Sequence, residues 1–258
     1  MSRAEGAPRE CSAGRNLWAA ALHLLFPTPC HVCGAPLDGE RVSSLCGRCW
    51  RSLERMPAAG CARCGWPFPD AGAAAGTEGP LCQRCRETED QFHLARAVLR
   101  YRTDGTARAA ILQAKHGRRL SLLRHLARLL AAEAPGYLPL AGWDGLVPVP
   151  LHWRRRWERG FNQAEVLARA VGRQHGLPVL RRVLVRVRST PRQHGDAEDR
   201  RRNVREAFAV RAPGAVRERR LLLVDDVFTT GATVNACARV LLDAGAAEIG
   251  VLTLARVE

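Results

Sequence analysis

The stretch LLLVDDVFTTGAT, residues 221–233, decides the fold. Four apolar residues precede two adjacent carboxylates, and a loop rich in threonine and glycine then leads into an amphipathic helix. The apolar run, residues 221–224, is typical of a buried strand in a parallel sheet. Ligands of such sheets bind beyond the carboxyl ends of the strands. The stretch therefore predicts an α/β fold with a binding site at residues 225–233.

The residue types at this site suit a sugar phosphate. Asp225 and Asp226 offer acceptors to two vicinal hydroxyls of a ribose. The loop that follows offers backbone N–H groups and three hydroxyls, its glycine permits close approach of the backbone, and a helix N-terminus favours an anion. The alternative is a solvated acid pair before a helix capped by threonine. The residues expected to hold phosphate are Thr229, Thr230, Gly231, Ala232 and Thr233.

The composition is that of a globular and strongly basic protein. The 258 residues carry a formal net charge of +15, and arginine supplies nearly all of the positive charge because Lys115 is the one lysine. Such a surface suits pyrophosphate, nucleotides or nucleic acid, although charge alone identifies none of them. No apolar run of about 20 residues predicts a membrane helix. Residues 17–26 follow three arginines but lack a small-residue cleavage site, so we expect a short helix, no signal peptide and a cytoplasmic location.

Eight of the ten cysteines form four Cys-x-x-Cys pairs. Two such pairs complete a tetrahedral thiolate site, and inside the cell zinc is favoured over disulfides. The pattern occurs twice, as CHVCGAP with CGRC and as CARCGWP with CQRC, which predicts tandem zinc ribbons with two structural zinc ions. Pairing in sequence order is favoured; a cross-braced arrangement, disulfides or an iron–sulfur cluster are the alternatives. The expected ligands are Cys30, Cys33, Cys46, Cys49, Cys61, Cys64, Cys82 and Cys85.

Two basic segments lie between the cysteines and the final signature. Residues 151–163 follow a short strand that ends in proline and contain four arginines, two tryptophans and a Gly-Phe-Asn-Gln helix start. We expect an anion site there, with a solvated loop as the alternative. The arginine-rich residues 188–206 are too polar for a core and predict either a mobile loop that closes over phosphate or an exposed helix face.

Three features together resemble the ComF family: the cysteine pairs, PVPL…RGFNQA within residues 148–164, and VDDVFTTGAT at residues 224–233. The last string also resembles the signature of type I phosphoribosyltransferases, whose two acids hold the ribose 2′ and 3′ hydroxyls of 5-phosphoribosyl 1-pyrophosphate (PRPP) and whose loop holds its 5′-phosphate. The resemblance runs from about residue 17 to the end of the chain. It implies a double zinc-ribbon domain at 17–90 and, at 92–258, a phosphoribosyltransferase-like α/β domain with a parallel sheet flanked by helices.

The family resemblance also extends to residues around the pyrophosphate and the closing loop. Those candidates are Lys115, Pro150, Leu151, Arg159, Gly160, Asn162, Gln163, Arg188, Thr190 and Gln193. The chain departs from the family after Gln193, where GDAED replaces a more apolar continuation, and at His116, where an aromatic residue is common.

Two functions follow from the resemblance. As an enzyme, the protein binds Mg²⁺-PRPP and transfers the phosphoribosyl group with release of pyrophosphate, with Asp225 and Asp226 as the candidate catalytic residues and with positioning and electrostatic stabilisation as its contribution. As a non-catalytic module, it senses PRPP or handles single-stranded DNA in competence and DNA uptake, with arginines on the backbone and tryptophans against the bases. Single-stranded DNA and competence proteins are the candidate partners; the acceptor, the pathway and the oligomeric state stay open.

Overall fold

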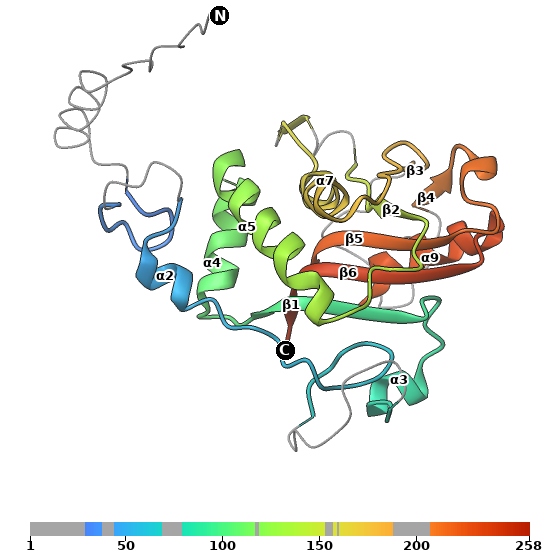
Figure 1. The fold of residues 1–258 in the computed structure, drawn as a ribbon, viewed down its shortest axis with the longest axis horizontal. Coiled ribbons are helices and arrows are strands. Elements are labelled where there is room, and N and C mark those ends of the chain that lie inside the picture. Colours follow the sequence, from blue (N-terminus) through green and yellow to red (C-terminus); the bar gives the residue numbers. More distant parts are fainter. Residues whose placement is uncertain are drawn as a thin grey trace, which may run out of the picture.

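A four-stranded parallel sheet forms the centre of the computed structural model (Figure 1). The structure describes residues 29–37, 44–68, 79–116, 119–152, 157–158, 160–187 and 207–258. In spatial order the strands are β1 (Leu94–Tyr101), β6 (Glu248–Val257), β5 (Arg220–Phe228) and β2 (Gly145–Pro148). The last strand of the chain is thus inserted between β1 and β5. This sheet confirms the predicted α/β class.

Helices cover both faces of the sheet. On one face lie α4 (Thr106–His116), α5 (Leu120–Glu133) and α7 (Gln163–His175). On the other lie α9 (Ala232–Asp243) and an antiparallel pair of short strands, β3 (Leu184–Arg186) and β4 (Phe208–Val210). Two short 3₁₀ turns, η1 (Ala134–Gly136) and η2 (Pro213–Ala215), lie in the connections.

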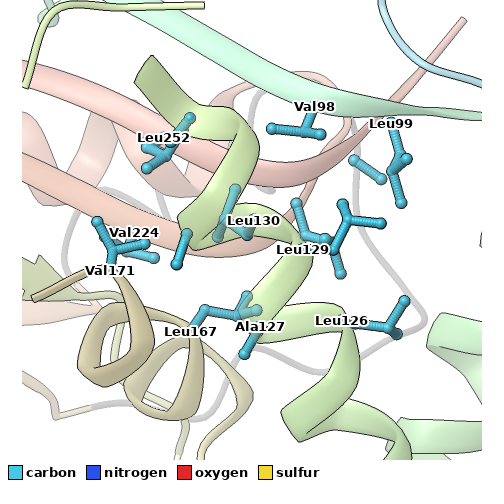
Figure 2. Packing of buried hydrophobic residues seen from close by; sticks show 14 of the residues in the cluster. Val98, Leu99, Leu126, Ala127, Leu129, Leu130, Leu167, Val171, Val224 and Leu252 are labelled. Atoms are coloured by element: carbon cyan, nitrogen blue, oxygen red, sulfur yellow. The ribbon is translucent and has the colours of Figure 1, made fainter. Parts of the chain in front are cut away.

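Strand β5 is apolar along its first half because both of its faces are buried. Leu222 and Val224 pack in the core below α5 and α7, while Leu221 and Leu223 pack in the core below α9. All four side chains are 0% exposed. Figure 2 shows Val224 among side chains of α5, α7 and β6. The alternation of adjacent strand residues between two cores explains the continuous apolar run.

The signature strand is longer than the apolar run predicts. Strand β5 continues through both carboxylates to Phe228 and stays paired with β6 over this length. Its other neighbour, β2, ends at Pro148, and the last bond on that side joins the Val149 N–H to the Val224 carbonyl at 2.9 Å. Asp225 and Asp226 therefore lie where β2 ends, next to the loop that follows it, rather than at the end of their own strand.

The two cysteine segments attach to the sheet differently. The first, with the short helix α2 (Gly47–Arg51), contributes Cys30, Cys49 and two leucines to the core shared with α5. The second, with α3 (Gln83–Glu87), has a small core of its own and joins the edge strand β1 through a 2.6 Å bond from the Ala95 N–H to the Arg63 carbonyl. The predicted domain boundary, at residues 90–92, falls between α3 and β1, and the division into two domains stays a prediction.

No helix in the part of the chain that the structure describes has both the length and the apolar character needed to cross a membrane.

Candidate functional site

The two signature carboxylates lie on different faces of the sheet. Lys115, in the last turn of α4, donates to Asp226 Oδ1 at 2.8 Å, and both side chains are less than one-fifth exposed. Asp225 Oδ1 accepts the backbone N–H of Asp226 at 2.8 Å. Adjacent residues of a strand point to opposite faces, so Asp225 lies toward α9 and β3. The candidate residue Lys115 is thus brought to the acid pair from a position 111 residues earlier in the chain.

Asp225 holds its proton more strongly than an ordinary carboxyl. Burial, and then the charge of Asp226, raise its pKa to about 7. The Asp226 N–H and the positive charges of Lys115 and Arg186 act against this shift but do not cancel it. Close to neutral pH, Asp225 is therefore partly protonated in the ligand-free protein, whereas an exposed aspartate is fully ionised.

The raised pKa makes the stability of the ligand-free protein depend on Asp225. The folded state binds the proton up to a pH of about 7, while the unfolded chain releases it near 3.8. The contribution of Asp225 is therefore complete below pH 3.8 and is lost as the pH rises through 7, by at most about 1.4 kcal/mol per pH unit. Denaturant unfolding of the wild type and of Asp225→Asn across this range measures the difference. If the free energies of unfolding of the two proteins changed in parallel with pH, this role of Asp225 would be contradicted.

The loop after β5 has the geometry of a tight turn into a helix. Thr229 and Thr230 are exposed, and Gly231 has a φ of +79° and stands at the N-cap of α9. A Cβ at position 231 would lie 2.9 Å from the Phe228 ring and 3.0 Å from Arg84 Nη2, so a larger residue has no space there. Helix α9 begins at Ala232, and its first N–H groups have no partner within the helix. The loop therefore presents the exposed side chains of Thr229 and Thr230 beside this helix N-terminus, and the Ala232 N–H donates to Thr230 Oγ1 at 3.4 Å.

The segment after β2 supplies the second predicted anion site. Asn162 is buried and caps α7: its Oδ1 accepts the Ala164 N–H at 3.1 Å, and its Nδ2 donates to the Val149 carbonyl at 3.0 Å. These two hydrogen bonds hold the start of α7 against the end of β2, a structural role that the sequence did not predict. Gly160 turns the chain with a φ of +79°, and Gln163, the first residue of α7, is buried.

Two further candidates, Pro150 and Leu151, follow Val149 after the end of β2 and are half-buried. Arg159, Arg188, Thr190, Gln193 and the predicted closing loop at 188–206 lie outside the described residues.

The eight paired cysteines form two groups of four. Cys30, Cys33, Cys46 and Cys49 form one group, and Cys61, Cys64, Cys82 and Cys85 form the other, with all sulfurs of a group within 4.8 Å of one another. Within the groups, one Sγ–Sγ distance is 3.6 Å and another is 3.7 Å. Sulfurs bound to one zinc at about 2.3 Å lie roughly 3.8 Å apart, whereas a disulfide is about 2.05 Å long. The grouping confirms pairing in sequence order and fits two structural zinc sites.

Both groups are built by the same local geometry. In each first pair, a glycine with positive φ follows the second cysteine and donates to the carbonyl of the first, at 2.9 Å from Gly34 and at 2.8 Å from Gly65. In each second pair, the first cysteine stands at the N-cap of a five-residue helix and donates its N–H to a sulfur of the other pair at 3.3 Å. Four thiolates per group leave no open position, as in structural zinc sites.

Buried arginines border the second group. The Arg256 guanidinium is 3% exposed and donates to the Cys64 carbonyl at 2.6 Å and to the Cys64 sulfur at 3.5 Å. Arg96 is 7% exposed, donates to the Ala62 carbonyl at 2.9 Å, and interacts with the charges of Cys61 and Cys64. Zinc with four thiolates carries two negative charges, which these two guanidinium groups offset. The donor set and its surroundings therefore fit a metal-bound tetrathiolate.

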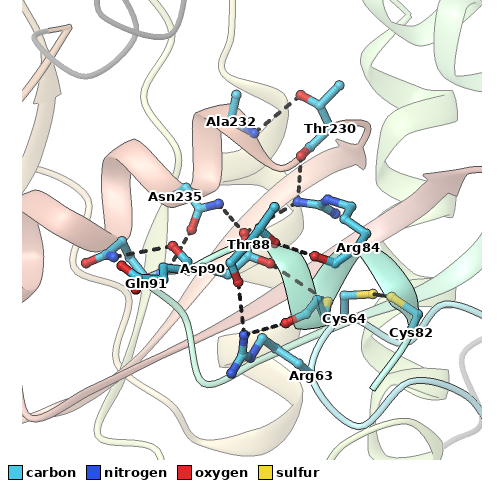
Figure 3. A network of polar contacts seen from close by, with 12 residues as sticks. Arg63, Cys64, Cys82, Arg84, Thr88, Asp90, Gln91, Thr230, Ala232 and Asn235 are labelled. Carbon is cyan, nitrogen blue, oxygen red and sulfur yellow. Dashed lines mark hydrogen bonds and ion pairs between the residues drawn. The ribbon is translucent and has the colours of Figure 1, made fainter. Parts of the chain in front are cut away.

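A polar network joins the second cysteine group to the loop after β5 (Figure 3). Arg84 Nη2 donates to the Thr230 carbonyl at 2.8 Å and forms an ion pair with Asp90 at 3.4 Å. Asp90 also accepts from Asn235, in the first turn of α9, and the Gln91 N–H donates back to Asn235 at 2.7 Å. No local sequence pattern predicts this network, because Arg84 stands inside a CQRC pair 146 residues before its partner.

Comparisons with known proteins agree with this architecture. A family model described as a double zinc ribbon domain matches residues 21–86, and one described as a phosphoribosyl transferase domain matches residues 158–258. The DNA utilization protein YhgH of Salmonella typhi is 34% identical over 243 residues, which cover 90% of this chain and 99% of that protein. Competence protein F of Haemophilus influenzae is 38% identical over 138 residues, 52% of this chain and 60% of its own length.

Among solved structures, the PRPP amidotransferase of Bacillus subtilis is 21% identical, with a TM-score of 0.35 over 51% of this chain and 25% of that one.

Proposed function

The chain belongs to the ComF family, in which a double zinc ribbon precedes a phosphoribosyltransferase domain, and from this we propose that it binds Mg²⁺-PRPP at residues 225–233. The observation that carries the proposal is the position of the acid pair. Asp225 and Asp226 lie next to the end of β2, and the exposed loop that opens α9 begins three residues after Asp226. Because the two carboxylates leave β5 on opposite faces of the sheet, a ribose that contacts both lies against the edge of β5 beyond the end of β2, beside the donors for the phosphate.

In the proposed complex, each part of PRPP meets a different element. The ribose hydroxyls donate to Asp225 and Asp226, and the 5′-phosphate accepts N–H and hydroxyl groups from residues 229–233. The pyrophosphate lies near Pro150, Leu151 and Gly160, with Lys115 as a nearby cation, and Mg²⁺ shares its charge. The family resemblance alone adds four further candidates for the pyrophosphate site and the closing loop: Arg159, Arg188, Thr190 and Gln193.

We propose that the bound PRPP then reacts with an acceptor. The bond between C1′ of the ribose and the pyrophosphate oxygen breaks, the pyrophosphate leaves with that electron pair, and a nucleophile of the acceptor forms the new bond to C1′. The protein contributes by aligning the acceptor with C1′ and by stabilising the charge on the leaving group.

A non-catalytic role in DNA handling is the second candidate. It is favoured by the names of two relatives, a DNA utilization protein and a competence protein, and by the net charge of +15. In this case PRPP acts as a regulatory ligand, and single-stranded DNA or competence proteins are the partners. We propose a cytoplasmic location and two domains, at 17–90 and 92–258, for either function.

Calorimetry with PRPP, in the presence and absence of Mg²⁺, tests the binding proposal. We expect one PRPP to bind per chain, with Mg²⁺ raising the affinity because it offsets the pyrophosphate charge. Absence of binding under both conditions would overturn the proposal.

A panel of nucleobases, followed by measurement of released pyrophosphate, separates the two functions. Turnover supports the enzyme. PRPP binding without turnover, combined with single-strand DNA affinity that falls steeply with salt, supports the binding module.

A further inference from the structure

Arg84 belongs to the second zinc ribbon but contacts the phosphate loop. It lies in α3, between the two cysteines of the last pair, and its guanidinium donates to the Thr230 carbonyl at 2.8 Å (Figure 3). The same Nη2 lies 3.0 Å from where a Cβ at Gly231 would stand. The guanidinium therefore fills the space behind the turn that gives Gly231 its positive φ.

The Phe228 ring provides a second link between the ribbon and the loop. Its Cζ lies 2.9 Å from where a Cβ at Gly231 would stand, so the ring also backs the turn. The Arg84 guanidinium lies 5.8 Å from the Phe228 ring centroid, and the Arg256 guanidinium lies 4.6 Å from it. Arg256 in turn donates to the carbonyl and the sulfur of Cys64. The turn is thus connected to a cysteine ligand through one aromatic ring and one arginine.

Helix α9 is tied to the same segment. Asp90 pairs with Arg84 and accepts from Asn235, and the Gln91 N–H also donates to the Asn235 side chain. The Asp90 side chain is 1% exposed, so this carboxylate is held in place between the two elements. The segment after α3 thereby fixes the first turn of α9, whose N–H groups face the loop.

We propose that Arg84 is a positioning residue for the phosphate loop, through which the second zinc ribbon holds residues 229–231 in their binding conformation. The identity of the ligand rests on the proposed function, whereas the contacts that hold the loop in place do not depend on it. A loop held in place before the ligand arrives does not have to be ordered on binding, and such preorganisation increases affinity. The second zinc ribbon is then a part of the PRPP site as well as a folding unit.

The variants Arg84→Ala, Arg84→Lys and Arg86→Ala test this proposal. Arg86 is an exposed arginine of the same helix and serves as the matched control. In Arg84→Ala we expect hydrogen exchange at residues 229–235 of the ligand-free protein to be about tenfold faster, and the PRPP dissociation constant to rise about tenfold, the effect of losing one hydrogen bond to a charged group. Arg84→Lys should recover part of both effects, and Arg86→Ala should match the wild type.

The exchange measurement distinguishes failure of this proposal from failure of the proposed function. If the wild type does not bind PRPP, the proposed function fails, while the exchange rates still report on the bracing. If Arg84→Ala leaves exchange at residues 229–235 unchanged, the positioning role is overturned.

Zinc removal tests the link to the cysteine group. Chelation should accelerate exchange in the wild type and have a smaller effect in Arg84→Ala, because the Arg84 contact is already lost there while the link through Phe228 and Arg256 to Cys64 is still lost with the metal. Fully additive effects would overturn the link.

Discussion

Replacing Asp225 and Asp226 together by asparagine is expected to abolish binding of Mg²⁺-PRPP. Each carboxylate is proposed to accept a hydrogen bond from a ribose hydroxyl, and a bond to a charged group contributes about 1.5–3 kcal/mol. Loss of both corresponds to a decrease in affinity of roughly 10²- to 10⁴-fold. Calorimetry at PRPP concentrations that saturate the wild type measures the difference.

At position 225, asparagine is the replacement that changes the site least. Asp225 has a pKa raised to about 7, so a neutral side chain at this position resembles the protonated form that the folded protein already tolerates. Asp226 is different, because its replacement leaves the Lys115 ammonium, on a side chain that is 18% exposed, without its carboxylate partner at 2.8 Å. Denaturant unfolding of Asp226→Asn measures the cost of this unpaired charge separately from the loss of a ligand contact.

Asp243→Asn is the control for the loss of a carboxylate. Asp243 ends α9, its side chain is 71% exposed, and its nearest partner is Arg239 at 4.0 Å, so its removal should change neither PRPP binding nor stability. Wild-type affinity in the double variant at the acid pair, with the control behaving as expected, would show that PRPP binds elsewhere or that the acids do not contact it.

The local pattern of the sequence predicts the elements of the site but not their partners. The apolar run at 221–224, the helix after Gly231 and the grouping of the cysteines all follow from spacing over a few residues. The ion pair between Lys115 and Asp226 joins residues 111 positions apart, and no local rule predicts it. The same holds for Arg84, whose neighbours in the sequence are metal ligands. Both contacts join segments that come close together only in the folded chain.

The length of β5 is a second feature that the local sequence pattern does not predict. Two carboxylates in succession predict the end of a buried strand, because charged side chains are rarely buried. In the structure the strand continues to Phe228, since one acid is paired with Lys115 and the other has a raised pKa. The exception to the pattern coincides with the candidate site, as expected where function takes precedence over local stability.

Metal analysis of the purified protein is expected to find two zinc ions per chain, and Cys61→Ser is expected to retain one. Cys61 is fully buried, and the core around it consists of cysteines with only a few apolar neighbours, so this segment has little to hold it together without the metal. Loss of a structural metal is among the most destabilising single changes and should lower the melting temperature by about 10 °C. Cys237→Ala is the control, because Cys237 is equally buried in α9 but belongs to neither group.

The two zinc sites should not contribute equally. In the second site, loss of the metal leaves the guanidinium groups of Arg96 and Arg256 buried beside an incomplete set of thiolates, and an uncompensated buried charge is costly. In the first site, Cys33 is exposed, and the surrounding leucines belong to the core shared with α5. Cys61→Ser should therefore destabilise the protein more than Cys30→Ser and should also loosen the phosphate loop. If Cys61→Ser and Cys30→Ser destabilised the protein equally and left the phosphate loop unaffected, the proposed role of Arg96 and Arg256 in offsetting the charge of the second site would be contradicted.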